Sequence, residues 1–243
     1  MRKSRISFQM SRPAPAPSRC VLLFARAPRA EAAVKGLCGG EALFALSQGR
    51  VRDAVAALPG VALVLVPPAA QAGTSFGEKL EAAFRNAAER GYEEIVAVPG
   101  DVPELTARDL AAAFRALSDT DTVLGPSSDG GVWLIGLRAG AVSFSGLFEN
   151  VPWRTPRVLG ALLGNAPKAV LLGELLDVDR RADARRLRDA LCAAKRDAIL
   201  LAVLETFLGR RPEVFAQGSR RRVPPHFDVP PPSRAPPLFL FTF

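Results

Sequence analysis

The sequence predicts an α/β protein, a three-layer sandwich in which helices cover both faces of a mainly parallel sheet. Short apolar runs alternate with longer amphipathic segments through residues 20–209, as they do in chains that build parallel sheets. The segment Asp129-Gly130-Gly131 joins two apolar runs and leaves no room for a helix, which indicates one irregular or antiparallel insertion in the sheet. Three of the apolar runs are followed closely by aspartate, which is typical of the ligand-binding edge of such sheets.

The first half of this region alternates strands and helices. Strands are expected at residues 20–26, 61–66 and 94–98, and helices at residues 31–48, 50–58 and 76–90. Valine and leucine fill the second strand, and Pro67-Pro68 ends it. The third helix rests on Leu80, Phe84 and Ala87, which share one face at a period of 3.6 residues. Glycines interrupt the first of the three helical segments.

The second half continues the pattern, except at the Asp-Gly-Gly turn. Strands are expected at residues 122–125, 132–137 and 169–172, and helices at residues 106–117, 155–163, 182–194 and 197–208. Thr106 and Asp109 have the spacing of a capping box, in which each side chain bonds the other residue's backbone amide. Thr155 is expected to cap the next helix. The elements therefore predict one sheet built from most of the chain.

One domain, residues 20–209, is expected between two tails. Residues 1–19 are basic and contain several prolines, and the apolar run behind them is thinner than that of a signal peptide. Residues 210–243 are rich in proline and arginine and are expected to be mostly disordered. No apolar stretch approaches the roughly 20 residues that cross a bilayer. We therefore expect a flexible leader, a catalytic domain and a flexible tail, without a membrane span.

The formal net charge of +8 suggests nucleic acid as the first class of partner to consider. Lysine and arginine gather at the two ends and at residues 180–196, and no ladder of aromatic residues runs among them, which argues against a nucleic-acid groove. The same charge attracts phosphorylated substrates. Cys20, Cys38 and Cys192 show neither zinc nor redox spacing, so a reduced, cytoplasmic protein is expected.

Histidine is missing from the expected domain, because His226, in the tail, is the chain's single histidine. This excludes a Ser-His-Asp triad, a Cys-His pair and a histidine-based zinc site in the domain. Acid–base chemistry therefore falls to carboxylates, to lysine or to Tyr92, the single tyrosine.

Aspartates follow three of the expected strands. Asp101 comes after residues 94–98, Asp129 after residues 122–125, and both Asp177 and Asp179 after residues 169–172. The carboxyl ends of parallel strands meet at one edge of a sheet, and carboxylate oxygens suit hard divalent cations. The pattern predicts a cation site and, through the cation, a phosphorylated ligand. From its own motif, a turn or helix-capping role for Asp101 is an equally good interpretation.

A series of short motifs, in order over about residues 20–190, resembles a known family. The motifs are Leu22-Leu23-Phe24-Ala25-Arg26-Ala27-Pro28, Val34-Lys35, Gly77-Glu78-Lys79-Leu80, Pro99-Gly100-Asp101-Val102-Pro103, Leu124-Gly125-Pro126, Asp129-Gly130-Gly131, Leu134-Ile135-Gly136-Leu137, Pro152-Trp153-Arg154-Thr155-Pro156 and Asp177-Val178-Asp179. As a set they resemble the glycosyltransferase-A-like (GT-A) bacterial proteins called radical-SAM/selenodomain-associated transferases or arsenosugar-biosynthesis glycosyltransferases. More distantly, they look like the guanylyltransferases of molybdenum-cofactor and phospholactate chemistry.

This resemblance implies a single-domain, Rossmann-like nucleotide-diphospho-sugar-transferase fold. The implied activity is metal-dependent glycosyl transfer from a nucleotide-diphosphate sugar to a small-molecule acceptor. The residues implied to bind the nucleotide are Ala25, Arg26, Ala27, Lys35 and Asp101. Those implied to hold Mg²⁺ or Mn²⁺ are Asp101 and Asp179, with Asp177 as a further candidate. Those implied to face the acceptor are Asp129, Gly130, Gly131 and Trp153.

Within that site, Asp101 would act through the metal and Asp129 would deprotonate the acceptor, with Glu149 as a second candidate base. Two further residues, Lys35 and Trp153, each have a plainer structural alternative. Lys35 is either a phosphate ligand or a solvated helix lysine, and Trp153 is either a sugar-stacking platform or a packed hydrophobe.

The chain departs from the family after its first strand. Relatives usually carry Pro-Gly-x-Val-Lys-Thr-Arg-Leu, whereas this chain has Val34-Lys35-Gly36-Leu37, so a bidentate phosphate ligand is missing. Two alternatives therefore stay open. One is nucleotidyl transfer to a phosphorylated small molecule, although residues 25–35 lack the expected glycine-rich loop with a basic residue. The other is a degenerate, non-catalytic sugar-nucleotide-binding domain. The oligomeric state stays open as well.

Overall fold

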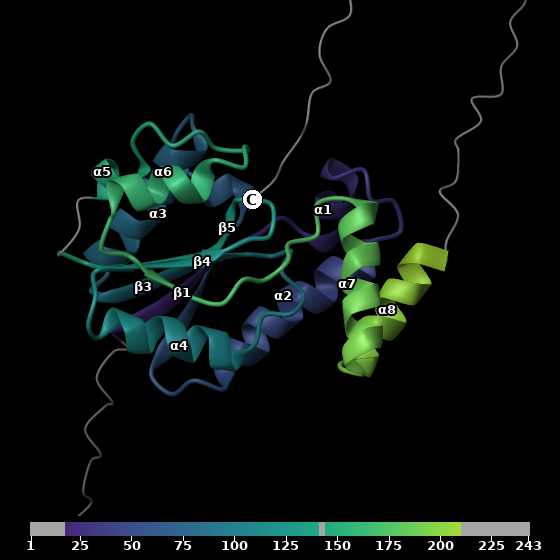
Figure 1. Ribbon diagram of the computed structural model, residues 1–243. Coiled ribbons are helices and arrows are strands. Elements are labelled where there is room, and N and C mark those ends of the chain that lie inside the picture. The colour runs from purple at the N-terminus through teal and green to yellow at the C-terminus, as the bar shows by residue number, and fades with distance from the viewer. Residues whose placement is uncertain (1–17, 141–143, 210–243) are drawn as a thin grey trace, which may run out of the picture.

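The computed structural model describes residues 18–140 and 144–209, which form one sheet between two helical layers (Figure 1). The predicted tail, and the predicted leader apart from its last two residues, lie outside the described residues. The domain bounds at residues 20 and 209 stay predictions. Among the described residues, no helix combines the length and the apolar character needed to cross a membrane.

The sheet has six strands in the order β2-β1-β3-β5-β4-β6. They are β1 (Arg19–Phe24), β2 (Val61–Val66), β3 (Glu94–Pro99), β4 (Thr122–Pro126), β5 (Val132–Arg138) and β6 (Val170–Leu171). β1 pairs in parallel with β2 and β3, and β4 pairs in parallel with β6. β5 runs antiparallel to both of its neighbours, β3 and β4. The predicted mainly parallel sheet with one antiparallel insertion is confirmed.

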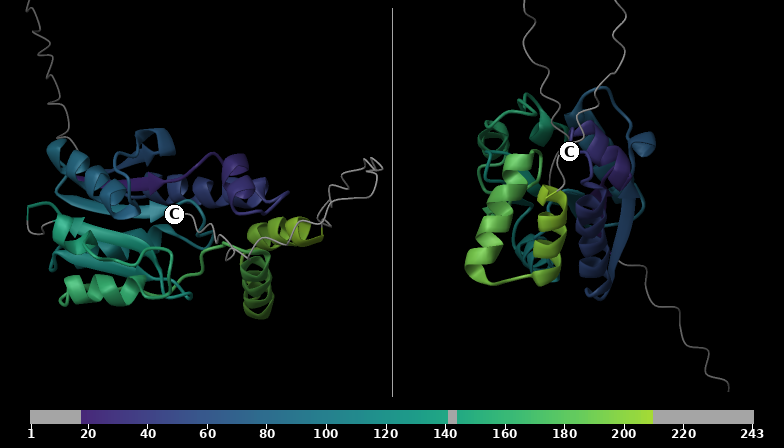
Figure 2. Two further views of the ribbon diagram at one scale, coloured as in Figure 1. Left: turned by 90° about the horizontal axis from the view of Figure 1, so that it is seen from above. Right: turned by 90° about the vertical axis from the view of Figure 1, so that its right-hand side faces the viewer.

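Eight α-helices and a short 3-10 turn accompany the sheet in the described part of the chain. They are α1 (Pro28–Val34), α2 (Glu41–Ala56), η1 (Pro68–Ala70), α3 (Phe76–Glu89), α4 (Ala107–Leu117), α5 (Phe144–Phe148), α6 (Val158–Asn165), α7 (Arg181–Ala194) and α8 (Ala198–Gly209). α3, α5 and α6 cover one face of the sheet, and α2 and α4 lie on the other (Figure 1). α7 and α8 stand beside the sheet, next to α1 and α2 (Figures 1 and 2).

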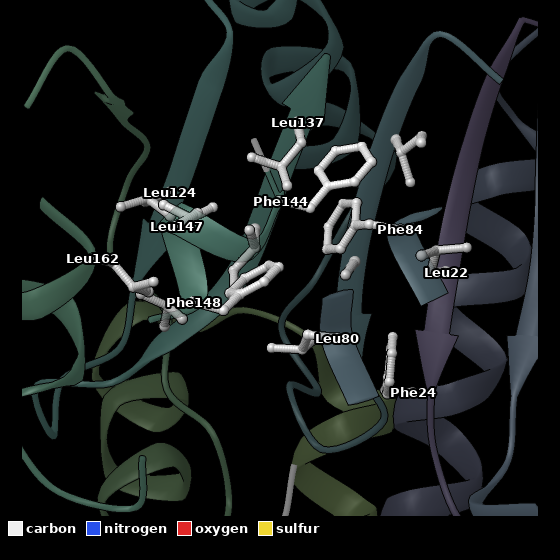
Figure 3. Close-up of a cluster of buried hydrophobic side chains, with 14 of the residues drawn as sticks. Leu22, Phe24, Leu80, Phe84, Leu124, Leu137, Phe144, Leu147, Phe148 and Leu162 are labelled. Atoms are coloured by element: carbon white, nitrogen blue, oxygen red, sulfur yellow. The ribbon is translucent and has the colours of Figure 1, made fainter. Parts of the chain in front are cut away.

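Each helical layer buries its own apolar cluster. On the first face, Phe84 of α3 lies 5.9 Å from the ring of Phe144 and 5.8 Å from that of Phe148, between centroids. Figure 3 shows these rings beside Leu22 and Phe24 of β1. A capping box of Ser75 and Glu78 starts α3, and the predicted box of Thr106 and Asp109 starts α4 on the other face. Favourable capping and amphipathic faces therefore fix both layers.

Two helix predictions are wrong in their bounds. The predicted glycine interruption of the first segment is found at residues 35–40, where Gly36 and Gly39 take positive φ angles of 66° and 80°. The second break, expected between residues 48 and 50, does not occur. Gly49 stays inside α2, whose buried Phe44 and Val51 outweigh the modest helix cost of one glycine. Thr155 does not cap a helix: α6 begins at Val158, and the Thr155 hydroxyl donates to the carbonyl of Pro152 at 2.7 Å within a turn.

Candidate active site

A cavity of about 320 Å³ opens at the edge of the sheet where the parallel strands end. Arg26 comes from the loop after β1, Asp101 from the loop after β3 and Asp129 from the β4–β5 turn. Asp177 and Asp179 reach the cavity from the segment between β6 and α7. The structure therefore brings the aspartates of all three strand ends to one place, at the edge where open α/β sheets bind ligands.

The carboxylates of this cavity form a tight acidic cluster. Asp129, Asp177 and Asp179 each offer one oxygen, and these atoms lie within 4.8 Å of one another. Asp101 is 3% exposed, and its Oδ1 atom has no hydrogen-bond partner among the described residues. A buried carboxylate oxygen without a partner costs free energy unless a ligand or water reaches it. The oxygen donors fit a hard divalent cation such as Mg²⁺ or Mn²⁺.

Lys35 lies behind this cluster and does not line the cavity. Its ammonium donates hydrogen bonds to Asp101 Oδ2, to Asp179 Oδ1 at 2.6 Å and to the carbonyl of Val178 at 3.1 Å. The side chain is 1% exposed, and Glu31 Oε1 lies 3.8 Å from its Nζ. The predicted metal pair, Asp101 and Asp179, is thus joined by a lysine. No residue spacing in the sequence could have predicted this contact.

The raised pKa values of Asp101 and Asp177 indicate an excess of negative charge in the acidic cluster. Burial raises the pKa of Asp177 to about 8, helped by the carboxylates of Asp101, Asp129 and Asp179. Burial likewise raises the pKa of Asp101 to about 6, although the Lys35 ammonium opposes the shift. Burial alone would lower the pKa of Lys35, but Asp101 and Asp179 together hold that pKa above its ordinary range. One internal cation does not balance the cluster, so a further cation is favoured there.

Another part of the cavity lining is aromatic and basic. The rings of Phe76 and Trp153 meet edge to face, with centroids 4.9 Å apart, and both line the cavity. Gly77 makes room for this contact, because a Cβ atom there would lie 2.9 Å from Trp153 Nε1. Lys79 and Arg154 lie on the same wall. Trp153 is therefore both a packed hydrophobe and a surface of the cavity.

The Asp129 turn is locked against this wall. Asp129 Oδ1 accepts a hydrogen bond from the Gly131 amide at 2.8 Å, which orients the carboxylate. Gly130 has a φ angle of 89°, and a Cβ atom there would lie 2.3 Å from the carbonyl oxygen of Pro156. Only glycine fits this conformation and this close approach. The turn and the Pro156 loop therefore form one continuous rim.

Of the remaining predicted residues, some line the cavity and others do not. Arg26 lines the cavity, and its Nη1 atom lies 3.3 Å from Glu31 Oε2. Ala25 and Ala27 flank Arg26 without lining the cavity themselves. Glu149 is exposed and lies outside the cavity lining, so the structure does not bring it to the cluster.

Sequence reasoning assigned no role to several cavity-lining side chains, namely Lys79, Arg154, Arg180, Asp183 and Arg186. Lys79 and Arg154 belong to two of the motifs that carry the family resemblance, and this membership could have identified them as candidate site residues.

Comparisons with known proteins bear on this arrangement. The family model of an uncharacterized protein conserved in bacteria (DUF2064) matches residues 43–155. A 3-phospho-D-glycerate guanylyltransferase from Phenylobacterium zucineum (strain HLK1) is 34% identical over 150 residues, which cover 61% of this chain and 67% of that protein.

The crystal structure of a candidate nucleotide-diphospho-sugar transferase from Desulfovibrio desulfuricans G20 superposes with a TM-score of 0.67 at 21% identity. The match covers 77% of this chain and 94% of that one. The structural likeness confirms the predicted nucleotide-diphospho-sugar-transferase-like fold. The narrower glycosyltransferase subfamily that the motifs resemble stays a prediction.

Proposed function

Because this chain belongs to the same family as the 3-phospho-D-glycerate guanylyltransferase, we propose that it is a nucleotidyltransferase acting on a phosphorylated small molecule. The 34% identity over 67% of that relative carries the proposal. By analogy with the relative, the donor is GTP and the acceptor resembles 3-phosphoglycerate. Glycosyl transfer becomes the second candidate, supported by the motif resemblance and by a likeness of fold, and fold alone does not assign chemistry.

In this reaction a phosphate oxygen of the acceptor attacks the α-phosphorus of the nucleoside triphosphate. A new P–O bond forms, the bond from the α-phosphorus to the oxygen that bridges it to the β-phosphorus breaks, and pyrophosphate leaves with that electron pair. The products are pyrophosphate and the acceptor joined to the nucleotide through a diphosphate linkage. Because the second pKa of such a phosphate is about 6, the attacking group is already ionised near pH 7. No side chain has to remove a proton.

The acidic cluster fits the Mg²⁺ or Mn²⁺ that the fold implies. One carboxylate oxygen each from Asp129, Asp177 and Asp179 lies within 4.8 Å of the others. Asp101 Oδ1 is buried and has no hydrogen-bond partner among the described residues. A divalent cation bound there supplies a Lewis acid that offsets charge on the phosphates. We propose that Asp101, Asp177 and Asp179 hold it, and that Asp129 joins them as a ligand, since nucleotidyl transfer leaves no work for a base.

Two of the protein's own cations, Lys35 and Arg26, have different roles around that cluster. Lys35 holds Asp101 and Asp179 in place from behind. Arg26 lines the cavity at the end of β1, and we propose that it binds donor phosphate where relatives use the arginine that Gly36 replaces. A replacement of this kind would keep the chain active, so the degenerate, non-catalytic alternative becomes the negative outcome of the test.

The test measures pyrophosphate release and thermal stabilisation of the full chain. GTP with Mg²⁺ or Mn²⁺ and 3-phosphoglycerate should release pyrophosphate, and GTP should raise the melting temperature only when the metal is present. Asp101→Asn should abolish both effects. Asp53→Asn, which neutralises an exposed aspartate of α2 outside the cavity, should preserve them.

Three results decide among the alternatives. Sugar transfer from a nucleotide sugar, without pyrophosphate release from GTP, would show that the protein is a glycosyltransferase. Absence of stabilisation by any nucleotide at millimolar concentration would support the alternative of a degenerate, non-catalytic domain. Retention of activity in Asp101→Asn would remove the acidic cluster from the mechanism.

A further inference from the structure

Within the described part of the chain, the two cations beside the aromatic rings of the cavity, Lys79 and Arg154, have no charged partner. Among residues 18–140 and 144–209, neither Lys79 nor Arg154 forms an ion pair or a side-chain hydrogen bond. Both line the cavity. Lys79 lies three residues after Phe76 in α3, on the same helix face, and Arg154 follows Trp153. Because Phe76 and Trp153 are in contact, the two cations belong to one surface.

Arg154 is held in a strained conformation. Its φ angle is 66°, a region that residues other than glycine rarely adopt. The surrounding loop fixes it: the Trp153 amide donates to the carbonyl of Val151 at 2.9 Å, and the Thr155 hydroxyl donates to the carbonyl of Pro152 at 2.7 Å. Strain of this kind persists where the surrounding structure imposes it, and it gathers at functional sites. The loop thus presents Arg154 at a defined place on the cavity wall.

The donor does not account for this pair of charges. A nucleoside triphosphate carries its negative charge on its phosphates, which the proposed function assigns to the acidic cluster, its cation and Arg26. The base and the ribose are uncharged, so two unpaired cations serve them poorly. A second anionic group on the acceptor suits them well, since arginine binds a carboxylate with two parallel hydrogen bonds and lysine adds a point charge.

We propose that Lys79 and Arg154 bind the carboxylate of the acceptor and thereby select phosphorylated acids over phosphorylated alcohols. This inference rests on the proposed function. The acidic wall admits an anion only through a bound cation, and the acceptor's phosphate takes that position. The carboxylate is repelled by the aspartates and is attracted to the two cations, Lys79 and Arg154. An acceptor with an anion at each end is thereby oriented with its phosphate toward the α-phosphorus.

The experiment compares two ligands that differ in the carboxylate. Isothermal titration calorimetry on the full chain with Mg²⁺ should show 3-phosphoglycerate binding at least about tenfold more tightly than glycerol 3-phosphate, the scale of a charge-assisted hydrogen bond. Arg154→Gln and Lys79→Met should each reduce this preference, and Arg154→Lys should restore part of it. Arg157→Gln removes an exposed charge outside the cavity lining and should leave the preference unchanged.

Melting temperatures near that of the parent chain establish that the variants fold. Equal affinity of the parent for the two ligands overturns the inference. So does a preference that survives in both Arg154→Gln and Lys79→Met, or a loss confined to GTP binding. Calorimetry decides these points without catalysis. A missing pyrophosphate signal with either acceptor counts against the proposed function instead.

Discussion

Lys35 places a positive charge at the centre of the site without reaching the cavity. Its ammonium bonds Asp101, Asp179 and the carbonyl of Val178, three groups from two segments that are distant in sequence. The resemblance implied a phosphate ligand at this position. The observed contacts instead suit a positioning residue that keeps two carboxylates together and leaves their other oxygens to a ligand.

Replacing Lys35 by methionine should destabilise the metal-free protein. The buried Asp101 and the half-buried Asp179 would lose their cation, and breaking a buried ion pair costs about 3–5 kcal/mol. Urea unfolding with a chelator should show this loss, and saturating Mn²⁺ should recover much of it. If Lys35→Met keeps its stability but no longer binds GTP, Lys35 is the phosphate ligand that the resemblance implied.

Asp177 carries a raised pKa of about 8, because it is partly desolvated and lies near three other carboxylates, those of Asp101, Asp129 and Asp179. Asp177→Asn removes one of the repelling charges. The melting temperature of the metal-free variant at pH 8 should therefore exceed that of the parent, while its stabilisation by Mn²⁺ should weaken. Asp53→Asn is the matched control and should change neither quantity. A lower melting temperature without metal would contradict this account.

Residue types at strand ends could be predicted, but their partners could not. Asp101, Asp129 and Asp179 stand out in the sequence because each follows an apolar run. The contact of Lys35 with Asp101 joins residues 66 positions apart and depends on how α1 packs with α2, α7 and α8 beside the sheet. Sequence periodicity describes only neighbours along one element, so contacts of this kind are invisible to it.

At the scale of elements, the first turn of α3 determines where Phe76 and Lys79 face the cavity. Hydrogen bonds from Thr74, through its hydroxyl and its amide, and from the Ser75 amide lower the pKa of Glu78 to about 2. The pKa in the unfolded chain, 4.5, is higher. The stabilising contribution of this carboxylate is therefore complete above pH 4.5 and disappears as the pH falls toward 2.

Glu78→Gln should lower the melting temperature at pH 6, and its deficit should shrink as the pH falls from about 4.5 to 2, where the parent loses the same charge. Circular dichroism melts across this range measure the effect. Glu89→Gln, at the far end of α3, provides the comparison for loss of an exposed carboxylate. A deficit that stays constant with pH would assign the effect to the shape of the side chain.

Element order could be predicted well because each strand and helix has its own periodic signal. The capping box of Thr106 and Asp109 is local, and the structure confirms it. Thr155 failed as a cap because its hydroxyl serves a turn whose shape depends on contacts with Gly77 and Gly130. The glycine interruption between α1 and α2 could be predicted, but the further break expected at residue 49 is absent because one glycine is tolerated inside a well-packed helix.

At the scale of the whole molecule, a third apolar cluster lies beside the sheet, between α1, α2, α7 and α8. Its members include Phe44, Leu187, Leu200, Leu204 and Phe207, all buried. The segment that carries Asp177 and Asp179 leads directly into α7. Packing of this helical unit therefore supports the position of the acidic cluster from a distance.

Leu204→Ala should lower the free energy of unfolding by about 2–5 kcal/mol, because a fully buried leucine leaves a cavity between α8 and its neighbours. Ile199, on the same helix, is 68% exposed, and Ile199→Ala should cost little. Urea denaturation of the two variants measures the contrast. Equal losses would show that α8 is not packed as described.

The ammonium between Asp101 and Asp179 also bears on how the protein is supplied with metal in the cell. A cluster of four aspartates without a cation of its own would be destabilised by repulsion between the carboxylates until a metal ion bound. Here the chain brings one positive charge with it, so it can reach its final shape while the ion is still scarce. If the proposed function holds, the amount of folded protein depends on its synthesis, whereas the active fraction depends on the concentration of the free ion.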